Sequence, residues 1–552
     1  MKSNHSLPFF PTRKACCDGG KLSVDFDAIV SAVQPTGLPH DGFRIRAKSE
    51  GISIEGNTLA AVDYARAMIR SVCQSDADGS FPLGLFEDYP DFPVRAYMLD
   101  ISRCKVPTMV HLQRLVDTLV ALRYNQLQLY MEHVFAYPQH ETVWAEASPM
   151  TADELRELDA YCQARHIELV PNQNSFGHME RWLRHPAYRS LAECPDGFIH
   201  PIAGRRDFGS VLYPGEESLT FLAGLYDDLL PNFTSKRFNV GCDEPWELGQ
   251  GRSRVAVAER GKQRVYLDFL RKIESLVASR GRVMHYWADI LLESPDLIAE
   301  APAGAIPVIW GYDVDHPFAE QCALLEENGM PFYVAPGDAT WKCFGGRLET
   351  TLKNQQMAAL EGLQHGASGY LLTHWGDLGH HQTWPTSLPA LVIGGQLSWN
   401  VAAEVELGLA AIINHLFFHE ASPVLAEVLL ELGRLDSQVP PIRVGSWFYE
   451  ALMGEVETPL AAETSARLLN QLDTLHSRLE TAHTKAKDGE WLRDEIHLGI
   501  EMTRWAIHRN GSQGENSAWA QSRSKLMHHF ETIWLRRNRA GGLRESMAYF
   551  PS

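Results

Sequence analysis

Two adjacent acidic residues, Asp243 and Glu244, follow a short apolar run near the middle of the chain, with Gly241 just before them. Neighbouring carboxylates repel each other, and a carboxylate near an apolar strand is poorly hydrated, so one of the two can stay protonated at neutral pH. A protonated carboxyl group of this kind can serve as a general acid. A solvated acidic pair at the start of a loop is the alternative interpretation, but the residues around the pair favour catalysis.

Aromatic and acidic side chains recur where other short apolar runs end. The chain has 14 tryptophans, many for its length, and their large flat faces suit stacking against sugar rings. Each tryptophan taken alone could equally belong to the core, but a set of them at strand ends predicts a sugar-binding pocket. These ends carry Glu132 and His133, Asn172 to His178, Trp287 to Asp289, Trp310 with Tyr312, Trp341, and Trp375 to Asp377.

The elements that must position these residues alternate in type. Between residues 94 and 400, eight short apolar runs are separated by stretches with helical periodicity, such as 110–122, 152–165 and 263–280. The pattern predicts an α/β fold, a (β/α)8 TIM barrel with its chemistry at the carboxyl ends of the strands. A doubly wound open sheet shows the same alternation, so periodicity alone does not distinguish a closed barrel from an open sheet. The predicted strands are 96–101, 126–131, 167–171, 237–241, 283–287, 307–310, 331–335 and 369–373.

Two further regions flank the predicted catalytic barrel of residues 94–400. Residues 1–93 form a predicted small α/β domain, with strands at 43–47 and 51–55, a helix at 59–73, and loop and linker chemistry at 81–84 and 89–93. Residues 401–552 form a predicted helical C-terminal domain, because strand patterns stop there. Its helical runs are 423–435, 461–487 and 490–509.

Composition excludes several other classes of protein. With 45% hydrophobic and 22% charged residues, the 552-residue chain is globular, and its net charge of −19 disfavours nucleic acid as a partner. No apolar run reaches the length of a membrane span, so we expect none. The run at 7–10 is too short for a signal peptide, and nine scattered cysteines fit reduced thiols. We therefore expect a cytoplasmic protein.

The motifs together resemble glycoside hydrolase family 20, the β-N-acetylhexosaminidases, and within it the subgroup that includes hexosaminidase D and streptococcal-type N-acetylglucosaminidases. They run in family order over about 280 residues, and the subgroup has the same layout of three regions. The matching segments are Arg95-Ala-Tyr-Met-Leu-Asp-Ile-Ser-Arg103, Asn125-Gln-Leu-Gln-Leu-Tyr-Met-Glu132, Ser175-Phe-Gly-His-Met-Glu180, Val240-Gly-Cys-Asp-Glu244 with Leu248-Gly-Gln-Gly-Arg252, and Thr373-His-Trp-Gly-Asp377.

The resemblance implies substrate-assisted catalysis, in which the 2-acetamido group of the sugar is the nucleophile. Glu244 would protonate the leaving oxygen and then act as base on water, while Asp243 would hold the acetamido N–H. Tyr312 would donate to the acetamido carbonyl, with Tyr333 as the competing candidate. The implied walls of the acetamido pocket are Trp287, Trp310 and Trp375, with Trp341 as a further wall.

The resemblance also implies residues that bind the rest of the sugar. Arg95 and Asp377 would bind sugar hydroxyls, although an ion pair of Arg95 with a nearby strand acid is the alternative. Glu132 and His178 would form a carboxylate–imidazole pair behind Glu244.

The predicted activity is that of an exo-acting retaining enzyme that removes terminal β-linked GlcNAc or GalNAc from glycans. A non-catalytic sugar-binding barrel and a β-glycosidase for sugars without an acetamido group are the alternatives. We expect no cofactor and no metal, because the adjacent histidines at 380 and 381 rarely point at one ion. The subgroup suggests a homodimer.

Overall fold

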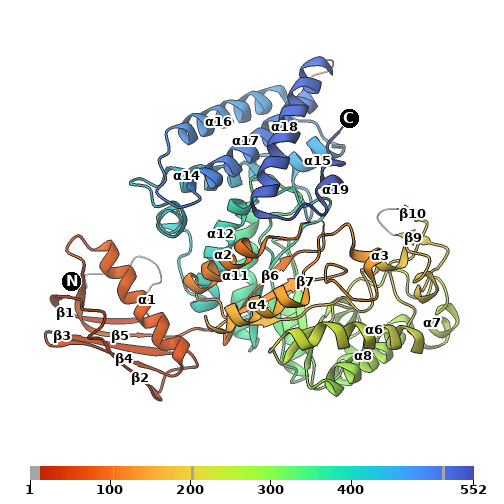
Figure 1. The fold of residues 1–552 in the computed structure, drawn as a ribbon, viewed down its shortest axis with the longest axis horizontal. Coiled ribbons are helices and arrows are strands. Elements are labelled where there is room, and N and C mark those ends of the chain that lie inside the picture. Colours follow the sequence, from red (N-terminus) through yellow and green to blue (C-terminus); the bar gives the residue numbers. More distant parts are fainter. Residues whose placement is uncertain (1–12, 104, 201–203, 512–515, 552) are drawn as a thin grey trace.

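The computed structural model describes residues 13–103, 105–200, 204–511 and 516–551. Figure 1 shows three units along the chain: a small sheet with one helix near the amino terminus, a central barrel, and a group of helices packed on one side of the barrel. The apolar run at 7–10, on which the signal-peptide expectation rests, lies outside the described residues.

The central unit is a closed barrel of eight parallel strands, which confirms the predicted fold class and excludes the open sheet. The strand order is β11-β12-β13-β14-β15-β6-β7-β8. Closure between the outermost strands comes from Asn239, whose backbone bonds to Pro171 and Gln173 at 3.0 Å each. The strands are β6 (Val94–Asp100), β7 (Gln126–Tyr130), β8 (Glu168–Val170), β11 (Arg237–Asn239), β12 (Val283–Trp287), β13 (Ile306–Trp310), β14 (Tyr333–Ala335) and β15 (Gly369–His374).

Helices between the strands surround the barrel, and their ends follow local capping rules. Helix α2 (Met109–Ala121) begins after Thr108, whose hydroxyl accepts the backbone N–H of His111. Helix α4 (Ala152–Gln163) begins with a reciprocal capping box between Thr151 and Glu154. The other long helices of this unit are α6 (Glu216–Leu229), α8 (Lys262–Ser279), α10 (Phe318–Glu327), α11 (Leu348–Gln364) and α12 (Leu388–Trp399).

The amino-terminal unit is a five-stranded sheet covered by helix α1 (Leu59–Ser75). The prediction of loop and linker chemistry from residue 81 is wrong for its first part, which forms strand β5. Pro82 is tolerated there because only the edge strand β1 pairs with that end of β5; the pairing with β3 starts at Gly84. In order across the sheet the strands are β1 (Lys14–Ser23), β5 (Ser80–Asp88), β3 (Phe43–Lys48), β4 (Gly51–Gly56) and β2 (Val30–Val33).

The carboxy-terminal unit is helical and is joined closely to the barrel. The end of α18 runs beside α2, where Thr108 donates its backbone N–H to Arg537 and Arg539 donates to Val106, both at 2.8 Å. Among the described residues, no helix has both the length and the apolar composition needed to cross a membrane. The main helices are α14 (Val424–Arg434), α15 (Trp447–Met453), α16 (Ala462–Glu480), α17 (Gly489–Gly511), α18 (Asn516–Arg537) and α19 (Leu543–Met547).

Candidate active site

The predicted acidic pair lies on a tight turn beyond the end of β11. Gly241, Cys242 and Glu244 all have left-handed backbone, with φ of 67°, 70° and 46°. Such conformations cost free energy for residues other than glycine and persist only where packing enforces them. A Cβ atom on Gly241 would lie 2.1 Å from Asn174 Oδ1, so the close approach of this loop requires glycine. The turn therefore fixes both carboxylates against the loop after β8.

His178 lies between the carboxylates and links them. Its Nε2 is 3.1 Å from Asp243 Oδ2 and 3.6 Å from Glu244 Oε2, and its Nδ1 is 4.0 Å from Glu132 Oε1. Burial opposes a charge on the ring, but the Asp243 and Glu244 carboxylates outweigh it and raise the pKa of His178 to about 10. His178 is therefore a cation at neutral pH, and the predicted pairing with Glu132 is looser than its pairing with Asp243.

Glu244 is the more accessible carboxylate of the pair. Its side chain is 32% exposed, whereas that of Asp243 is 10% exposed. Burial raises the pKa of Glu244; the His178 cation lowers it, and the Asp243 carboxylate adds to the rise. The elevated pKa and the exposure suit a group that must hold a proton and deliver it to a bound molecule.

Asp289, at the start of α9 (Asp289–Leu292), completes the acidic group. One of its oxygens accepts the backbone N–H of Glu244 at 3.1 Å. Burial and the Asp243 carboxylate raise the pKa of Asp289 well above its usual range. It was not among the predicted site residues. Its position two residues after Trp287, at a strand end, could have identified it. Asp289 holds the backbone turn that carries Glu244.

Aromatic rings from four strand ends surround the space beside Asp243. The ring centroids of Trp310 and Tyr312 lie 5.2 Å apart in a stacked arrangement, Tyr312 and Trp341 are 5.1 Å apart, and Trp287 and Trp375 are 5.9 Å apart. The structure thus brings together all four predicted tryptophans and Tyr312.

Tyr333, the competing candidate, lies at the opposite end of the barrel interior. It begins β14, and its ring packs on His285. Burial raises its pKa to about 12, and the charged groups that act on it are Arg237 and Glu168, which lie near strand starts. Among the described side chains, Asp243 Oδ1, Trp287 Nε1 and Trp341 Nε1 are buried near the aromatic group without a hydrogen-bond partner in the protein. Buried polar atoms are normally satisfied, so these three are suited to a polar ligand.

The prediction that Arg95 binds sugar hydroxyls is wrong, because Arg95 lies at the other end of the barrel. Arg95 is completely buried at the start of β6, where it pairs with Asp41 at 3.2 Å and donates to the backbone of Arg123 and Phe92. Its guanidinium also lies 5.1 Å from the ring of Trp399. The strand starts face the amino-terminal unit, so Arg95 joins that unit to the barrel and does not reach the carboxyl ends of the strands.

Arg103, just beyond the other end of the same strand, takes the position expected for Arg95. Its guanidinium is 3.1 Å from Asp100 and 3.4 Å from Glu132, and lies over the rings of Tyr130 and Trp375 at 4.7 and 5.2 Å. Sequence reasoning missed Arg103 because it took the first arginine of the motif.

Glu132 and Asp377 both interact with the Arg103 guanidinium. Burial raises the pKa of both carboxyl groups, and the Arg103 guanidinium counteracts this rise in each. Together the three residues offer forked donors and carboxylate acceptors at the edge of the aromatic group, a combination that suits vicinal hydroxyls.

The known proteins that this chain resembles are glycoside hydrolases, in agreement with the site described above. The family model described as glycosyl hydrolase family 20, catalytic domain, matches residues 92–396. Human hexosaminidase D is 25% identical over 464 residues, which cover 74% of this chain and 93% of that protein. A β-hexosaminidase of Akkermansia muciniphila is 26% identical over 280 residues, which cover 45% of this chain and 56% of that protein.

Solved structures show the same fold at low sequence identity. A family 20 exo β-N-acetylglucosaminidase from Vibrio harveyi, solved with N-acetylglucosamine, superposes with a TM-score of 0.60 at 14% identity, covering 75% of this chain and 77% of that one. A chitobiase from Flavobacterium johnsoniae gives a TM-score of 0.60 at 13% identity and covers 97% of this chain and 98% of its own.

Proposed function

Because this chain belongs to glycosyl hydrolase family 20 and is a glycoside hydrolase of the β-N-acetylhexosaminidase type, we propose that it removes terminal β-linked GlcNAc or GalNAc. The reaction retains the configuration of the anomeric carbon, and the substrate's acetamido group is the nucleophile. The observation that carries the mechanism is the pairing of Asp243 with a cationic His178. This contact occupies Asp243 Oδ2 and leaves the buried Oδ1 without a protein partner.

In the first step the acetamido oxygen attacks the anomeric carbon and the glycosidic C–O bond breaks. Glu244 gives its proton to the leaving oxygen, a role supported by its raised pKa and its exposed oxygens. The product of this step is an oxazolinium ion, formed on the sugar itself. Glu244 then takes a proton from water as the water attacks the anomeric carbon. The bond from this carbon to the acetamido oxygen breaks, which regenerates the acetamido group, and this second displacement restores the original configuration.

Asp243 orients the nucleophile in this proposal. Its Oδ1 accepts the acetamido N–H, and its negative charge faces the positive charge that spreads over the forming ring. His178 holds the carboxylate through Oδ2 and cannot itself accept the acetamido proton, because its ring is already protonated. Because the substrate supplies the nucleophile, neither carboxylate has to attack the opposite face of the sugar, so the two acidic residues can be neighbours in sequence.

The aromatic group provides the pocket for the acetamido methyl. Trp287, Trp310, Trp341 and Trp375 exclude water from the reacting group, which strengthens the interactions of Asp243 within it. We assign the donor to the acetamido carbonyl to Tyr312, because it lies among these rings and Tyr333 does not. Arg103, Asp377 and Glu132 bind the sugar hydroxyls.

A panel of aryl β-glycosides tests the proposal. We expect hydrolysis of the β-GlcNAc and β-GalNAc substrates and negligible hydrolysis of the β-glucoside, which lacks the nucleophile. Equal rates on the glucoside would indicate a β-glycosidase with its own nucleophile. Binding without turnover of any substrate would indicate a sugar-binding barrel. The homodimer suggested by the family subgroup is part of the proposal, and light scattering of the purified protein tests it.

A further inference from the structure

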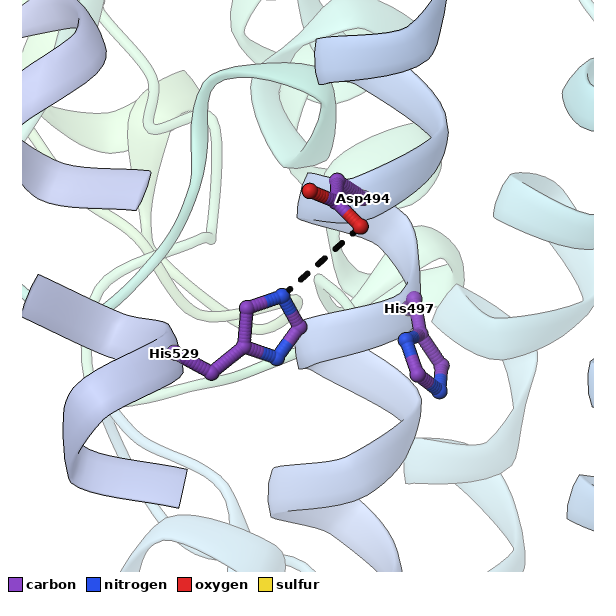
Figure 2. A group of neighbouring side chains, drawn as sticks. All are labelled: Asp494, His497 and His529. Atoms are coloured by element: carbon purple, nitrogen blue, oxygen red, sulfur yellow. Dashed lines mark ion pairs between the residues drawn. The ribbon is translucent and has the colours of Figure 1, made fainter. Parts of the chain in front are cut away.

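Histidines and carboxylates gather on the carboxy-terminal helices, away from the strand ends of the barrel. Asp494, His497 and Glu501 lie on one face of α17, at spacings of three and four residues, and His529 faces them from α18. Figure 2 shows Asp494, His497 and His529 around the gap between the two helices. All of these side chains are half-buried, so they are both held by packing and open to a small ion.

The hydrogen bond of His529 determines which of its nitrogens is free. Its Nδ1 lies 2.9 Å from Glu501 Oε2, so Nδ1 carries the proton and donates it. In the neutral ring Nε2 is then a bare lone pair, and it points at Asp494 Oδ1 from 3.8 Å. That distance is too long for a hydrogen bond. A carboxylate that orients a histidine through its far nitrogen is the usual outer contact of a metal-binding histidine.

Asp494 is oriented in a comparable way. Its Oδ2 pairs with the guanidinium of Arg536 at 2.8 Å, while Oδ1 faces His529. Asp494, Glu501 and Arg536 together carry a net charge of −1, which attracts a divalent cation. Asp494 and His529 thus each have one atom bonded to the protein and one atom turned toward the gap.

His497 provides a third donor. Its ring centroid is 5.7 Å from that of His529 and 4.9 Å from that of His476 on α16. The half-buried ring is held beside His529, where one of its nitrogens can bind a metal ion. The donor atoms of Asp494, His497 and His529 all lie within 4.8 Å of one another.

We propose that Asp494, His497 and His529 bind one Zn²⁺ ion that joins α17 to α18. Zinc bonds of about 2.0–2.2 Å in a tetrahedron place donors roughly 3.4 Å apart, so small side-chain rotations close the site. Two imidazoles and one carboxylate favour zinc over magnesium or calcium, which prefer oxygen ligands alone. Water takes the fourth position.

The ion has a structural role in this proposal. Helix α18 leads directly into the segment that bonds to the barrel at Val106 and Thr108, and Glu495 of α17 pairs with Arg537 of α18 at 2.6 Å. A ligand that binds only the folded protein raises its apparent stability in proportion to the logarithm of ligand concentration. Zinc should therefore hold the helical unit against the barrel without entering the glycosidase reaction.

Equilibrium dialysis of the tag-free, chelator-treated protein against ZnCl2 tests the site. We expect one Zn²⁺ per chain, at least a tenfold loss of affinity in His497→Ala and His529→Ala, and a loss of about 10–100-fold in Glu501→Gln, which removes the carboxylate behind His529. His528→Ala is the matched control, because His528 is the exposed neighbour of His529 on the same helix. It should bind zinc as the unchanged protein does.

Thermal unfolding with and without zinc provides a second measurement. Zinc should raise the Tm of the unchanged protein and of His528→Ala, and should leave the Tm of the His497→Ala/His529→Ala double variant unmoved. Circular dichroism of the metal-free variants checks that they fold. Absence of saturable zinc binding by the unchanged protein, or unchanged affinity in the folded double variant, would overturn the proposal.

Discussion

His178→Gln removes the cation that lies between Asp243 and Glu244. The closest approach of His178 Nε2 to Glu244 is 3.6 Å, to Oε2. Unit charges at this separation interact by about 4–5 kcal/mol at an effective dielectric constant of about 20, and by about 1 kcal/mol in water. Because the Glu244 side chain is one-third exposed, the lower part of this range applies. Since 1.36 kcal/mol corresponds to one pKa unit, the pKa of Glu244 should rise by about one unit.

The sign of the effect on activity follows from the role of Glu244 as an acid. Activity requires the protonated form, so kcat/KM falls as pH rises through the pKa of Glu244. Loss of the His178 cation favours the protonated form and should move the alkaline limb of the profile to higher pH by about one unit. The plateau should also fall, because a neutral amide holds the Asp243 carboxylate less strongly than the cationic ring does.

The assay is the pH profile of kcat/KM for an aryl β-GlcNAc substrate with a poor leaving group. His185→Gln is the control, because that ring is partly exposed and its pKa is lowered by burial, so it carries no charge at neutral pH. Its profile should match that of the unchanged enzyme. An alkaline limb that stays in place or moves to lower pH in His178→Gln would refute the charge coupling described here.

Three further predictions follow from the site. Glu244→Gln should lower kcat by about 10²–10⁴-fold on substrates with poor leaving groups while still binding product, and retention of a tenth of the activity would contradict its role. Azide should restore the hydrolysis of activated aryl substrates by Glu244→Ala but not by Asp243→Asn, because the latter lacks orientation of the substrate's own nucleophile; equal rescue would reverse the two roles. Arg103→Lys should raise KM with little change in Tm, whereas Arg95→Lys should lower Tm with little change in KM, and steady-state kinetics with thermal unfolding distinguish the two.

Much of the barrel could be predicted from periodicity, because buried parallel strands are short apolar runs between amphipathic helices. The prediction for 283–287 coincides with β12, and β7 differs from its prediction by one residue. The 331–335 prediction begins too early, since pairing in β14 starts only at Tyr333. Strand β5 was missed because Pro82 and Gly84 are turn residues in most contexts, and only its pairing partners make it a strand.

The incorrect prediction for Arg95 could have been avoided, because its position along the strand is visible in the sequence. Arg95 lies near the start of β6 and Asp100 at its end. A strand rises about 3.3 Å per residue, so roughly 17 Å separate the two. A barrel keeps its chemistry at the carboxyl ends, so Arg103 was the better choice from the same motif. The same reasoning favours Tyr312, beyond the end of β13, over Tyr333 at the start of β14.

The group on α17 and α18 could not be found from local spacing. Asp494 and His497 are three residues apart, but His529 lies on another helix more than thirty residues later. Only the packing of the two helices brings the three side chains to one gap.

Participation of the acetamido group is the central claim, and it can be measured directly with aryl β-glucosaminides whose N-acetyl group carries zero, one, two or three fluorines. Fluorine withdraws electron density from the carbonyl oxygen and weakens it as a nucleophile, while the leaving group and the sugar hydroxyls stay the same. The proposed mechanism predicts that kcat falls steeply with each fluorine added. A kcat that stays constant across the series would show that another group attacks the anomeric carbon.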